Sequence, residues 1–426
     1  MIMEQIKERV LIVGVELGND EFDIEDSLDE LEELVLAAGG VVEGRLLQRK
    51  DKINASLFVG KGKVEEIKDY CKQLEIDTVV FNDELSGSQL RNLEKIIERK
   101  IIDRTTLILD IFALRAQSKE GKLQVKLAQM KYRLPRLVGM RDYLSREGAG
   151  IGTRGPGEQK LETDRRHILR EIKYVEKQLQ EVESIREVKR KKRLSSNMPM
   201  VALVGYTNSG KSTLTNSLMV HDTQEEDFKN VYVEDMLFAT LDTSHRISKL
   251  PNGQEFLISD TVGFVSKLPT KLVEAFKGTL EEVKYADLLL HVVDASNKDL
   301  DIQIKTTISI LKDLNVMDKP IITVFNKMDK ADKENMMYDH NLVDDILFIS
   351  CKTGYNLELL LEKIQEKLPQ EYRKVKLLIP FDKQSLINYF MNNYEVDNLE
   401  YLDVGTTMEL TIDVVDYEKY KNYIIE

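Results

Sequence analysis

The 426-residue chain has no tryptophan and only two cysteines, Cys71 and Cys351. Two cysteines cannot form a disulfide framework or a four-cysteine zinc site, so the reducing cytoplasm fits best. No stretch reaches the roughly 20 consecutive apolar residues that span a bilayer, so any membrane association would have to be peripheral. The N-terminal residues carry charges on both sides of a short apolar run and lack a small-residue cleavage site, so we expect no secretory signal peptide.

Basic residues are outnumbered by acidic ones. Lys and Arg number 61 against 74 Asp and Glu, a formal net charge of −13, which taken alone argues against a nucleic-acid partner. The distribution argues otherwise, because residues 115–193 hold 22 basic and 11 acidic residues and the rest of the chain therefore carries −24. A charged helix face is often only solvated, but Lys and Arg also neutralise phosphates, so this segment is where we expect RNA contact.

The order of apolar and polar residues divides the chain into four parts. Residues 1–105 alternate strand-like runs with helical patterns, which predicts a small, mainly parallel α/β domain. Residues 106–195 are helical and basic. A second α/β pattern occupies residues 196–370, and residues 371–426 predict a small α+β domain.

Within the second part, apolar residues recur every three or four positions, which is the spacing of a coiled-coil seam. The seam consists of Leu161, Ile168, Ile172, Val175, Leu179 and Val182, and an earlier series that would form its antiparallel partner is Leu123, Leu127, Met130 and Leu134. Between the two lies GAGIGTRGPGE (148–158), which contains five glycines. We therefore predict a long helical hairpin with a glycine-rich tip, whose small residues let an RNA backbone approach closely. The basic residues on or beside it are Arg154, Arg165, Arg166 and the run KRKKR at 189–193.

A phosphate-binding loop is predicted at 205–212. GYTNSGKS follows the apolar run MVALV and precedes a helical pattern, the context that a P-loop requires. Gly205 and Gly210 allow backbone N–H groups to turn around phosphate oxygens at the positive end of the following helix. Lys211 would contact the β- and γ-phosphates, and the Ser212 hydroxyl would ligate Mg²⁺. The predicted contacts in this loop are Gly205, Tyr206, Thr207, Asn208, Ser209, Gly210, Lys211, Ser212 and Thr213.

NKMD at 326–329 predicts which base is bound. Asp329 would accept hydrogen bonds from the guanine N1–H and exocyclic amine, a donor pair that adenine lacks, so GTP and GDP are favoured over ATP. SCK at 350–352 is placed to offer backbone N–H groups to guanine O6, and we interpret the Cys351 thiol as incidental. The predicted base contacts are Asn326, Lys327, Met328, Asp329, Ser350, Cys351 and Lys352.

Two switch segments complete the nucleotide site. In DTVG (260–263), Asp260 would hold Mg²⁺ through water and the Gly263 N–H would sense the γ-phosphate. Upstream, Thr240 is the candidate for the switch I threonine that ligates Mg²⁺ in the triphosphate state, with Thr243 as the alternative. The predicted contacts are Phe238, Ala239, Thr240, Leu241, Asp242, Asp260, Thr261, Val262 and Gly263, and the predicted catalytic residues are Lys211, Thr240 and Gly263. Together these motifs predict a Ras-like GTPase domain.

Two positions refine the expected mechanism. Phe264 follows DTVG where many such enzymes have a glutamine that orients the attacking water. An apolar side chain cannot do this, so we expect slow intrinsic hydrolysis that depends on a partner or a rearrangement. Asn208 matches a position where some GTPases place an Asn that helps to bind K⁺; the alternative is an Asn that only satisfies the loop.

With these motifs in place, the chain resembles the HflX family of ribosome-associated GTPases over nearly its whole length. Besides the nucleotide motifs, the resemblance rests on VGKGKVEEI (59–67), VVFNDELSGSQLRNLE (79–94), residues 103–137 and GAGIGTRGPGEQKLETDRR (148–166). Two departures are Ser209, where an Ala is common, and LDTSHR, where the family more often has LDPTTR. The second leaves the edge of switch I open.

The resemblance implies a partner and a reaction. It implies that the N-terminal domain and the hairpin contact the large (50S) ribosomal subunit and its 23S rRNA, and that the ribosome stimulates GTP hydrolysis. It also implies that the protein, expected to be a monomer, splits 70S ribosomes under stress. Two alternatives stay open: an ATP-dependent RNA remodelling factor, which would need ATP bound by residues 1–105, and an assembly or signalling GTPase that acts on protein partners.

Overall fold

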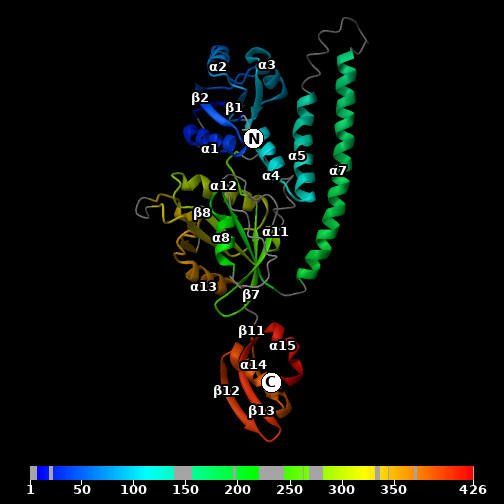
Figure 1. Cartoon of the computed structure of the whole chain (residues 1–426), viewed down its shortest axis with the longest axis vertical. Helices are drawn as coiled ribbons and strands as arrows, with labels where there is room; N and C mark the ends of the chain where they lie inside the picture. Colours follow the sequence, from blue (N-terminus) through cyan, green and yellow to red (C-terminus); the bar gives the residue numbers. More distant parts are fainter. Residues whose placement is uncertain are drawn as a thin grey trace, which may run out of the picture.

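The computed structural model describes residues 7–18, 23–138, 156–194, 198–219, 244–261, 263–267, 282–331, 336–343, 345–368 and 372–425. Its parts follow one another along an elongated molecule (Figure 1). An α/β domain at one end is joined by a pair of long helices to a second α/β domain, and a small α+β domain lies at the other end. The predicted fold class is confirmed.

The N-terminal domain contains a four-stranded parallel sheet in the order β2-β1-β3-β4. Its strands are β1 (Arg9–Leu17), β2 (Val41–Lys50), β3 (Thr78–Phe81) and β4 (Lys100–Asp103), and its helices are α1 (Ile24–Ala37), α2 (Lys61–Gln73), α3 (Gly87–Ile97) and α4 (Arg104–Arg115). Helices α2 and α3 cover one face of the sheet, and α1 and α4 cover the other. Strand β2 was not apparent from the sequence, because it lies at an edge and its polar residues face outward.

The core on the α1 side continues beyond residue 105. Apolar residues of α4, among them Ile108 and Phe112, are fully buried there, and Val125 and Ala128 of the next helix join the same cluster. The hydrophobic core on this side of the sheet therefore includes residues from the first part of the predicted helical segment. The boundary at residue 105 stays a prediction.

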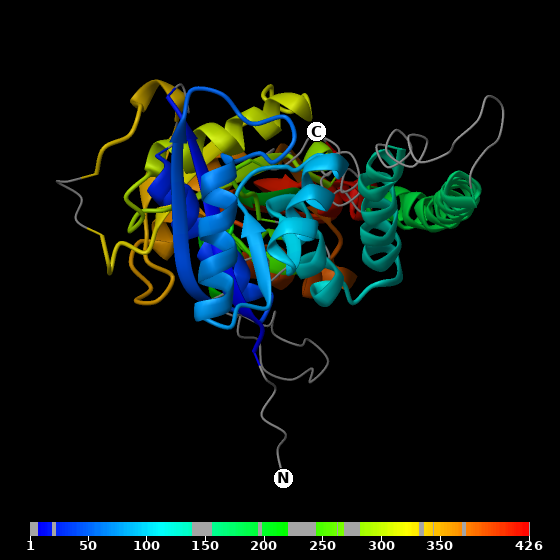
Figure 2. The same ribbon diagram turned by 90° about the horizontal axis from the view of Figure 1, so that it is seen from above.

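Two long helices form the predicted antiparallel hairpin. Helix α5 (Lys119–Val138) lies between the N-terminal domain and helix α7 (Pro156–Leu194), as Figure 2 shows from above. Eight residues of the predicted seam form one cluster: Leu127, Met130, Ile172 and Val175 are buried, and Leu123, Leu134, Ile168 and Leu179 pack around them. Val182 is half-buried and is not part of this cluster, and the side chain of Leu161 lies outside the described residues. The glycine-rich tip before Pro156, with Arg154, and the side chains of 189–193 lie outside the described residues.

The second domain contains a six-stranded sheet in the order β10-β9-β8-β5-β7-β6, parallel except for β6. Its strands are β5 (Met200–Gly205), β6 (Ser244–Lys249), β7 (Glu255–Asp260), β8 (Leu288–Asp294), β9 (Ile321–Asn326) and β10 (Ile346–Phe348). Its helices are α8 (Lys211–Leu218), α11 (Glu282–Tyr285), α12 (Leu300–Asp313) and α13 (Leu357–Lys367), with a 3₁₀ turn η2 (His340–Leu342). Helices α8 and α13 pack on one face and α11 and α12 on the other.

The order of the strands places a ligand site at one edge of this sheet. From β5 the chain builds β6 and β7 on one side and then β8, β9 and β10 on the other, so the order reverses between β5 and β8. In open α/β sheets, ligands bind outside the carboxyl ends of the strands at this switch point. Strands β5 and β8 end there at Gly205 and Asp294.

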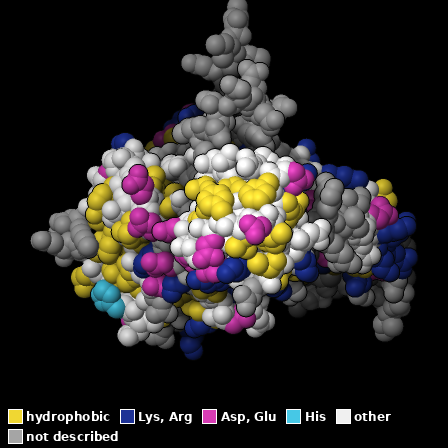
Figure 3. Space-filling model, turned by 90° about the horizontal axis from the view of Figure 1, so that it is seen from below, with side chains coloured by type: hydrophobic (Ala, Val, Ile, Leu, Met, Phe, Trp, Pro, Cys, Tyr) yellow, Lys and Arg dark blue, Asp and Glu magenta, His cyan; other side chains and the backbone are white. Residues whose placement is uncertain are grey.

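The C-terminal domain is an antiparallel sheet in the order β11-β13-β12 with two helices packed on one face. Its elements are β11 (Tyr372–Ile379), η3 (Phe381–Lys383), α14 (Gln384–Asn393), β12 (Val396–Leu402), β13 (Gly405–Asp413), α15 (Val414–Lys419) and η4 (Lys421–Tyr423). Seen from below, hydrophobic side chains gather on this end of the molecule with carboxylates between them (Figure 3). Phe381, Tyr401 and Val404 are among the exposed ones. Within the described residues, no helix is long and apolar enough to cross a membrane.

Candidate functional site

The loop between β5 and α8 is a tight backbone turn that only glycine permits at two positions. Gly205 has a φ of +147°, and a Cβ atom there would lie 2.2 Å from the carbonyl oxygen of Val292. Gly210 has a φ of +93°, and a Cβ atom there would lie 2.2 Å from the side-chain nitrogen of Asn326. Any larger residue would push the loop away from β8 and β9. The loop therefore stays in contact with the strands whose ends complete the site.

Lys211 is buried beneath this loop. Its Nζ donates hydrogen bonds to the carbonyl oxygens of Gly205 (3.1 Å) and Tyr206 (2.6 Å). Burial lowers the pKa of Lys211 to about 8, and the nearby Asp260 carboxylate opposes that shift. Because a bound phosphate would add negative charge next to the ammonium group, it would favour the charged lysine.

The DTVG segment lies directly against the P-loop. A Cβ atom on Gly263 would lie 2.8 Å from the Cα of Thr207 and 3.1 Å from the Nζ of Lys211. The Thr207 N–H donates to the Phe264 carbonyl (2.7 Å), and the Phe264 N–H donates to the Gly205 carbonyl (3.1 Å). The Phe264 side chain is buried in the core of the domain, so it does not reach into the nucleotide site.

Two side chains with oxygen donors meet at the end of β7. The Ser212 hydroxyl donates a hydrogen bond of 2.7 Å to the Asp260 carboxylate. Ser212 lies in the first turn of α8, and Asp260 is the last residue of β7. A hydroxyl and a carboxylate side by side are the hard oxygen donors that Mg²⁺ prefers.

The NKMD and SCK segments are connected to each other and to the P-loop. The Ser350 hydroxyl donates to the Asp329 carboxylate (2.7 Å), and this hydrogen bond holds the pKa of Asp329 below its usual value. Asn326 donates to the Ser209 carbonyl (3.0 Å) and accepts from the Cys351 N–H (3.1 Å). The carboxylate of Asp329 is thereby kept ionised and its neighbours are fixed in place.

Lys327 joins the NKMD segment to β8. Its Nζ lies 2.8 Å from the Asp294 carboxylate and 3.4 Å from the side-chain oxygen of Asn208. Asn208 has a φ of 57°, a left-handed conformation that asparagine tolerates better than most residues. The amide oxygen predicted as a K⁺ ligand therefore already faces a cation.

The structure brings together most of the predicted nucleotide residues, from the P-loop, the end of β7, NKMD and SCK. The switch I residues Phe238, Ala239, Thr240, Leu241 and Asp242, the alternative Thr243, and Val262 lie outside the described residues. Burial raises the pKa of the Cys351 thiol to about 12, so it stays protonated. His291, interpreted from the sequence as a core residue, is buried in β8, and burial lowers its pKa to about 3.

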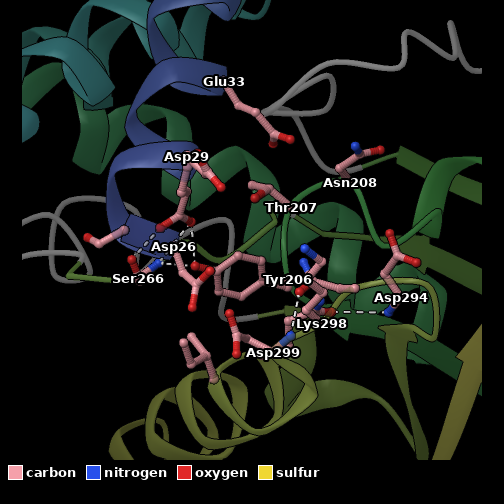
Figure 4. A pocket seen from close by; sticks show the side chains of 15 residues that line it. Asp26, Asp29, Glu33, Tyr206, Thr207, Asn208, Ser266, Asp294, Lys298 and Asp299 are labelled. Carbon is pink, nitrogen blue, oxygen red and sulfur yellow. Dashed lines mark hydrogen bonds between the residues drawn. The ribbon is translucent and has the colours of Figure 1, made fainter. Parts of the chain in front are cut away.

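A pocket that was not predicted lies beside the P-loop. It has a volume of about 310 Å³ and is lined by residues of α1 of the N-terminal domain, of the P-loop and of the start of α12 (Figure 4). Acidic residues of α1, including Asp26 and Glu30, face Thr207 and Asn208 across it. The acidic stretch of α1 is visible in the sequence, but no local pattern shows which distant loop it meets.

Family models match this chain in three successive segments. They are described as GTP-binding GTPase N-terminal (residues 25–113), GTP-binding GTPase Middle Region (115–193) and 50S ribosome-binding GTPase (200–327). GTPase HflX of Caldanaerobacter subterraneus is 47% identical over 98% of this chain and 94% of its own length. The chain belongs to the HflX family of GTPases. It therefore binds GTP and hydrolyses it, and both predictions are confirmed.

Two more curated relatives give the same result for this HflX-family chain. GTPase HflX of Lacrimispora saccharolytica is 45% identical over 95% of this chain and 93% of its own length. GTPase HflX of Escherichia coli K12 is 36% identical over 97% of this chain and 95% of its own length. A solved complex of SsGBP with GDP is 27% identical and covers 85% of this chain and 98% of that chain, with a TM-score of 0.47.

Replacing Asp329 tests its expected role in base recognition by this HflX-family GTPase. Asp329→Asn offers an amide where guanine presents two donors, so we expect GTP to bind about 10- to 100-fold more weakly and xanthosine triphosphate to bind more tightly. Competition binding with both nucleotides measures the change. Asp318→Asn, an exposed aspartate in a loop, is the control. Unchanged GTP affinity in Asp329→Asn would contradict the role of this carboxylate.

The pocket predicts a pH dependence of stability. The pKa of Asp26 is raised from 3.8 to about 6. The largest cause is a hydrogen bond with Asp299 at the start of α12, and burial and the charges of Asp299, Asp23 and Asp29 add to it. Lys298 also lines this pocket. Between about pH 4 and 6, Asp26 is still protonated in the folded state but ionised in the unfolded state. The free energy of unfolding therefore falls as the pH rises through that range. Since both groups are partly exposed, the effect is below about 1 kcal/mol.

The test is Asp299→Asn, because Asn is equally suited to the start of a helix. We expect the variant to melt at a higher temperature than the parent at pH 7.5 and at nearly the same temperature at pH 4.5. Asp51→Asn, on an exposed loop, should show no such pH-dependent difference. A lower melting temperature of Asp299→Asn at pH 7.5 would show that the two carboxyl groups do not repel.

Proposed function

We propose that this HflX-family GTPase binds the large ribosomal subunit and splits 70S ribosomes into subunits under stress. The observation that carries the proposal is the match of residues 200–327 to the family described as 50S ribosome-binding GTPase. GTP-dependent ordering of the two switch segments would raise its affinity for the subunit, and hydrolysis would release it. The protein would act as a monomer in the cytoplasm, where ribosomes are.

In this proposal the P-loop and the switches act on the phosphates. Lys211 would supply positive charge to the β- and γ-phosphates, and the backbone N–H of Gly263 would donate a hydrogen bond to the γ-phosphate when it is present. Their proximity, 3.1 Å between the Nζ of Lys211 and a Cβ position on Gly263, supports a shared target. Thr240 would close over the triphosphate from switch I. Asp329, with Ser350 holding its carboxylate, would select guanine.

Mg²⁺ would be held by the oxygen donors at the end of β7. The contact between Ser212 and Asp260 supports this, and Ser212 would bind the ion directly and Asp260 through water. Thr240 would join them in the triphosphate state. When bound, the ion would neutralise charge on the phosphate oxygens.

The hairpin would provide the contact with 23S rRNA. Arg165 and Arg166 are exposed on α7. Their guanidinium nitrogens lie 3.9 Å and 3.0 Å from the Glu162 carboxylate, so the three side chains lie on one turn of the helix. Arg154 would contribute from the tip, together with the N-terminal domain. The chain would then be divided at about residues 105, 195 and 370 into the four predicted domains.

Sedimentation of 70S ribosomes tests the splitting activity. With saturating protein and a non-hydrolysable GTP analogue, we expect the 70S peak to give way to 30S and 50S peaks, and Lys211→Ala protein should leave 70S particles intact. Intact 70S particles with the parent protein would defeat the proposal. Phosphate release that is equal with and without 50S subunits would instead favour an assembly GTPase acting on protein partners.

A second experiment tests K⁺ binding by Asn208. If its amide oxygen is a ligand, hydrolysis should be about tenfold faster in KCl than in NaCl, and Asn208→Ala should remove the difference. The contact with Lys327 at 3.4 Å is the competing interaction. Equal rates in the two salts would leave Asn208 a residue that only stabilises the loop.

A further inference from the structure

One carboxylate of the N-terminal domain contacts two segments of the nucleotide site. Glu30, on α1, accepts a hydrogen bond from the hydroxyl of Tyr206 in the P-loop and another from the hydroxyl of Ser266, three residues after Gly263. The Ser266 N–H also lies 3.3 Å from the Glu30 carboxylate. Tyr206 and Ser266 are therefore joined in two ways: directly, because the Ser266 N–H donates to the Tyr206 hydroxyl (2.5 Å), and through Glu30, which lies more than 170 positions away in the sequence from either.

This contact is buried and charged. Arg104, whose side chain is 2% exposed, forms an ion pair with Glu30 and donates to the Ser266 hydroxyl at 2.9 Å. Its second amino group donates to Asn82 at 2.9 Å. Burial, reinforced by the Glu30 charge, raises the pKa of Tyr206 well above its ordinary value, so its hydroxyl stays a donor. Charge-assisted hydrogen bonds of this kind are stronger than neutral ones.

The residues on either side of Ser266 are held by the same domain. Val265 is fully buried in the apolar cluster between the N-terminal sheet and helices α1 and α4. Lys267 forms an ion pair of 2.7 Å with Asp83, which follows β3. The segment directly after DTVG is thus packed into the N-terminal domain, while Tyr206 brings the P-loop to the same carboxylate.

We propose that Glu30 is a positioning residue. It holds switch II, the segment that begins with DTVG and continues through Ser266, against the P-loop and so slows the release of bound GDP. In the proposed function the phosphates of a nucleotide would lie between these two segments, and the Gly263 backbone packs against Thr207. Separating the segments breaks the hydrogen bonds that converge on Glu30. The inference concerns the isolated protein and is independent of ribosome splitting.

A double-mutant cycle on GDP release tests this role. Release of a fluorescent GDP analogue is followed after adding excess unlabelled GDP. Tyr206→Phe and Ser266→Ala each remove one hydroxyl without creating a large cavity, and we expect each to speed release about tenfold, the effect of one lost charged hydrogen bond. Glu30→Gln should do the same or more, and adding Tyr206→Phe to it should speed release by clearly less than tenfold. Part of the Tyr206 effect acts through the Glu30 carboxylate, and only the direct bond from the Ser266 N–H to the Tyr206 hydroxyl is still there to lose.

Matched variants separate this role from general loosening. Glu25→Gln, an exposed residue of the same helix, and Tyr401→Phe, an exposed tyrosine of the C-terminal domain, should release GDP at the parent rate. Asp83→Asn breaks the ion pair between Asp83 and Lys267, which joins the two domains, but leaves Glu30 in place, so it should have a smaller effect. Circular dichroism melts confirm that each variant is folded.

Three results would overturn the proposal. The first is a parent rate of release in folded Glu30→Gln. The second is full multiplication of the Tyr206→Phe and Glu30→Gln effects, which would show that the two residues act separately. The third is a larger effect of Asp83→Asn than of Glu30→Gln, which would assign the retention of GDP to domain docking in general.

Discussion

The nucleotide site depends on three backbone segments that approach more closely than any side chain permits. Gly205 passes against β8, Gly210 against Asn326, and Gly263 against Thr207, each at a distance that a Cβ atom could not occupy. A clash with a Cβ atom at these distances cannot be relieved by a small shift, whereas a hydrogen bond can lengthen. The three contacts bring the ends of β5, β7, β8 and β9 to one point. The hydrogen bond from Asn326 to the Ser209 carbonyl and the bond from Ser212 to Asp260 both require that convergence.

A second organising feature is the separation of charge. Acidic residues of α1 line the pocket beside the P-loop, and the excess of basic residues belongs to the sequence segment 115–193, whose described part forms the hairpin. A negative surface near the phosphate site would discourage RNA from entering it, because both carry negative charge. In the proposed function, the hairpin would offer the favourable electrostatic surface. The net charge of the whole chain hides this division.

Much of the fold and site was predictable because the motifs are local. GYTNSGKS, DTVG, NKMD and SCK each follow a buried strand, and parallel strands bring their carboxyl ends to one edge. The hairpin seam was equally visible, since its period is a property of one helix. Strands β2 and β6 were missed because edge strands need no continuous apolar run. Glu30 was missed for a different reason: its partners lie far along the chain, and only the packing of two domains brings them together.

Helix α7 has a mechanical consequence. It contains 39 residues and is therefore about 58 Å long, and only five residues separate Leu194 at its end from Met200 at the start of β5. Strand β5 runs straight into the P-loop. Such a rod is a lever whose short connection enters β5 at the end opposite to the P-loop, one strand length away, and whose far end leads to the predicted RNA-binding tip. A tilt of about 5° at its base would move that tip by about 5 Å, the rise of one helical turn.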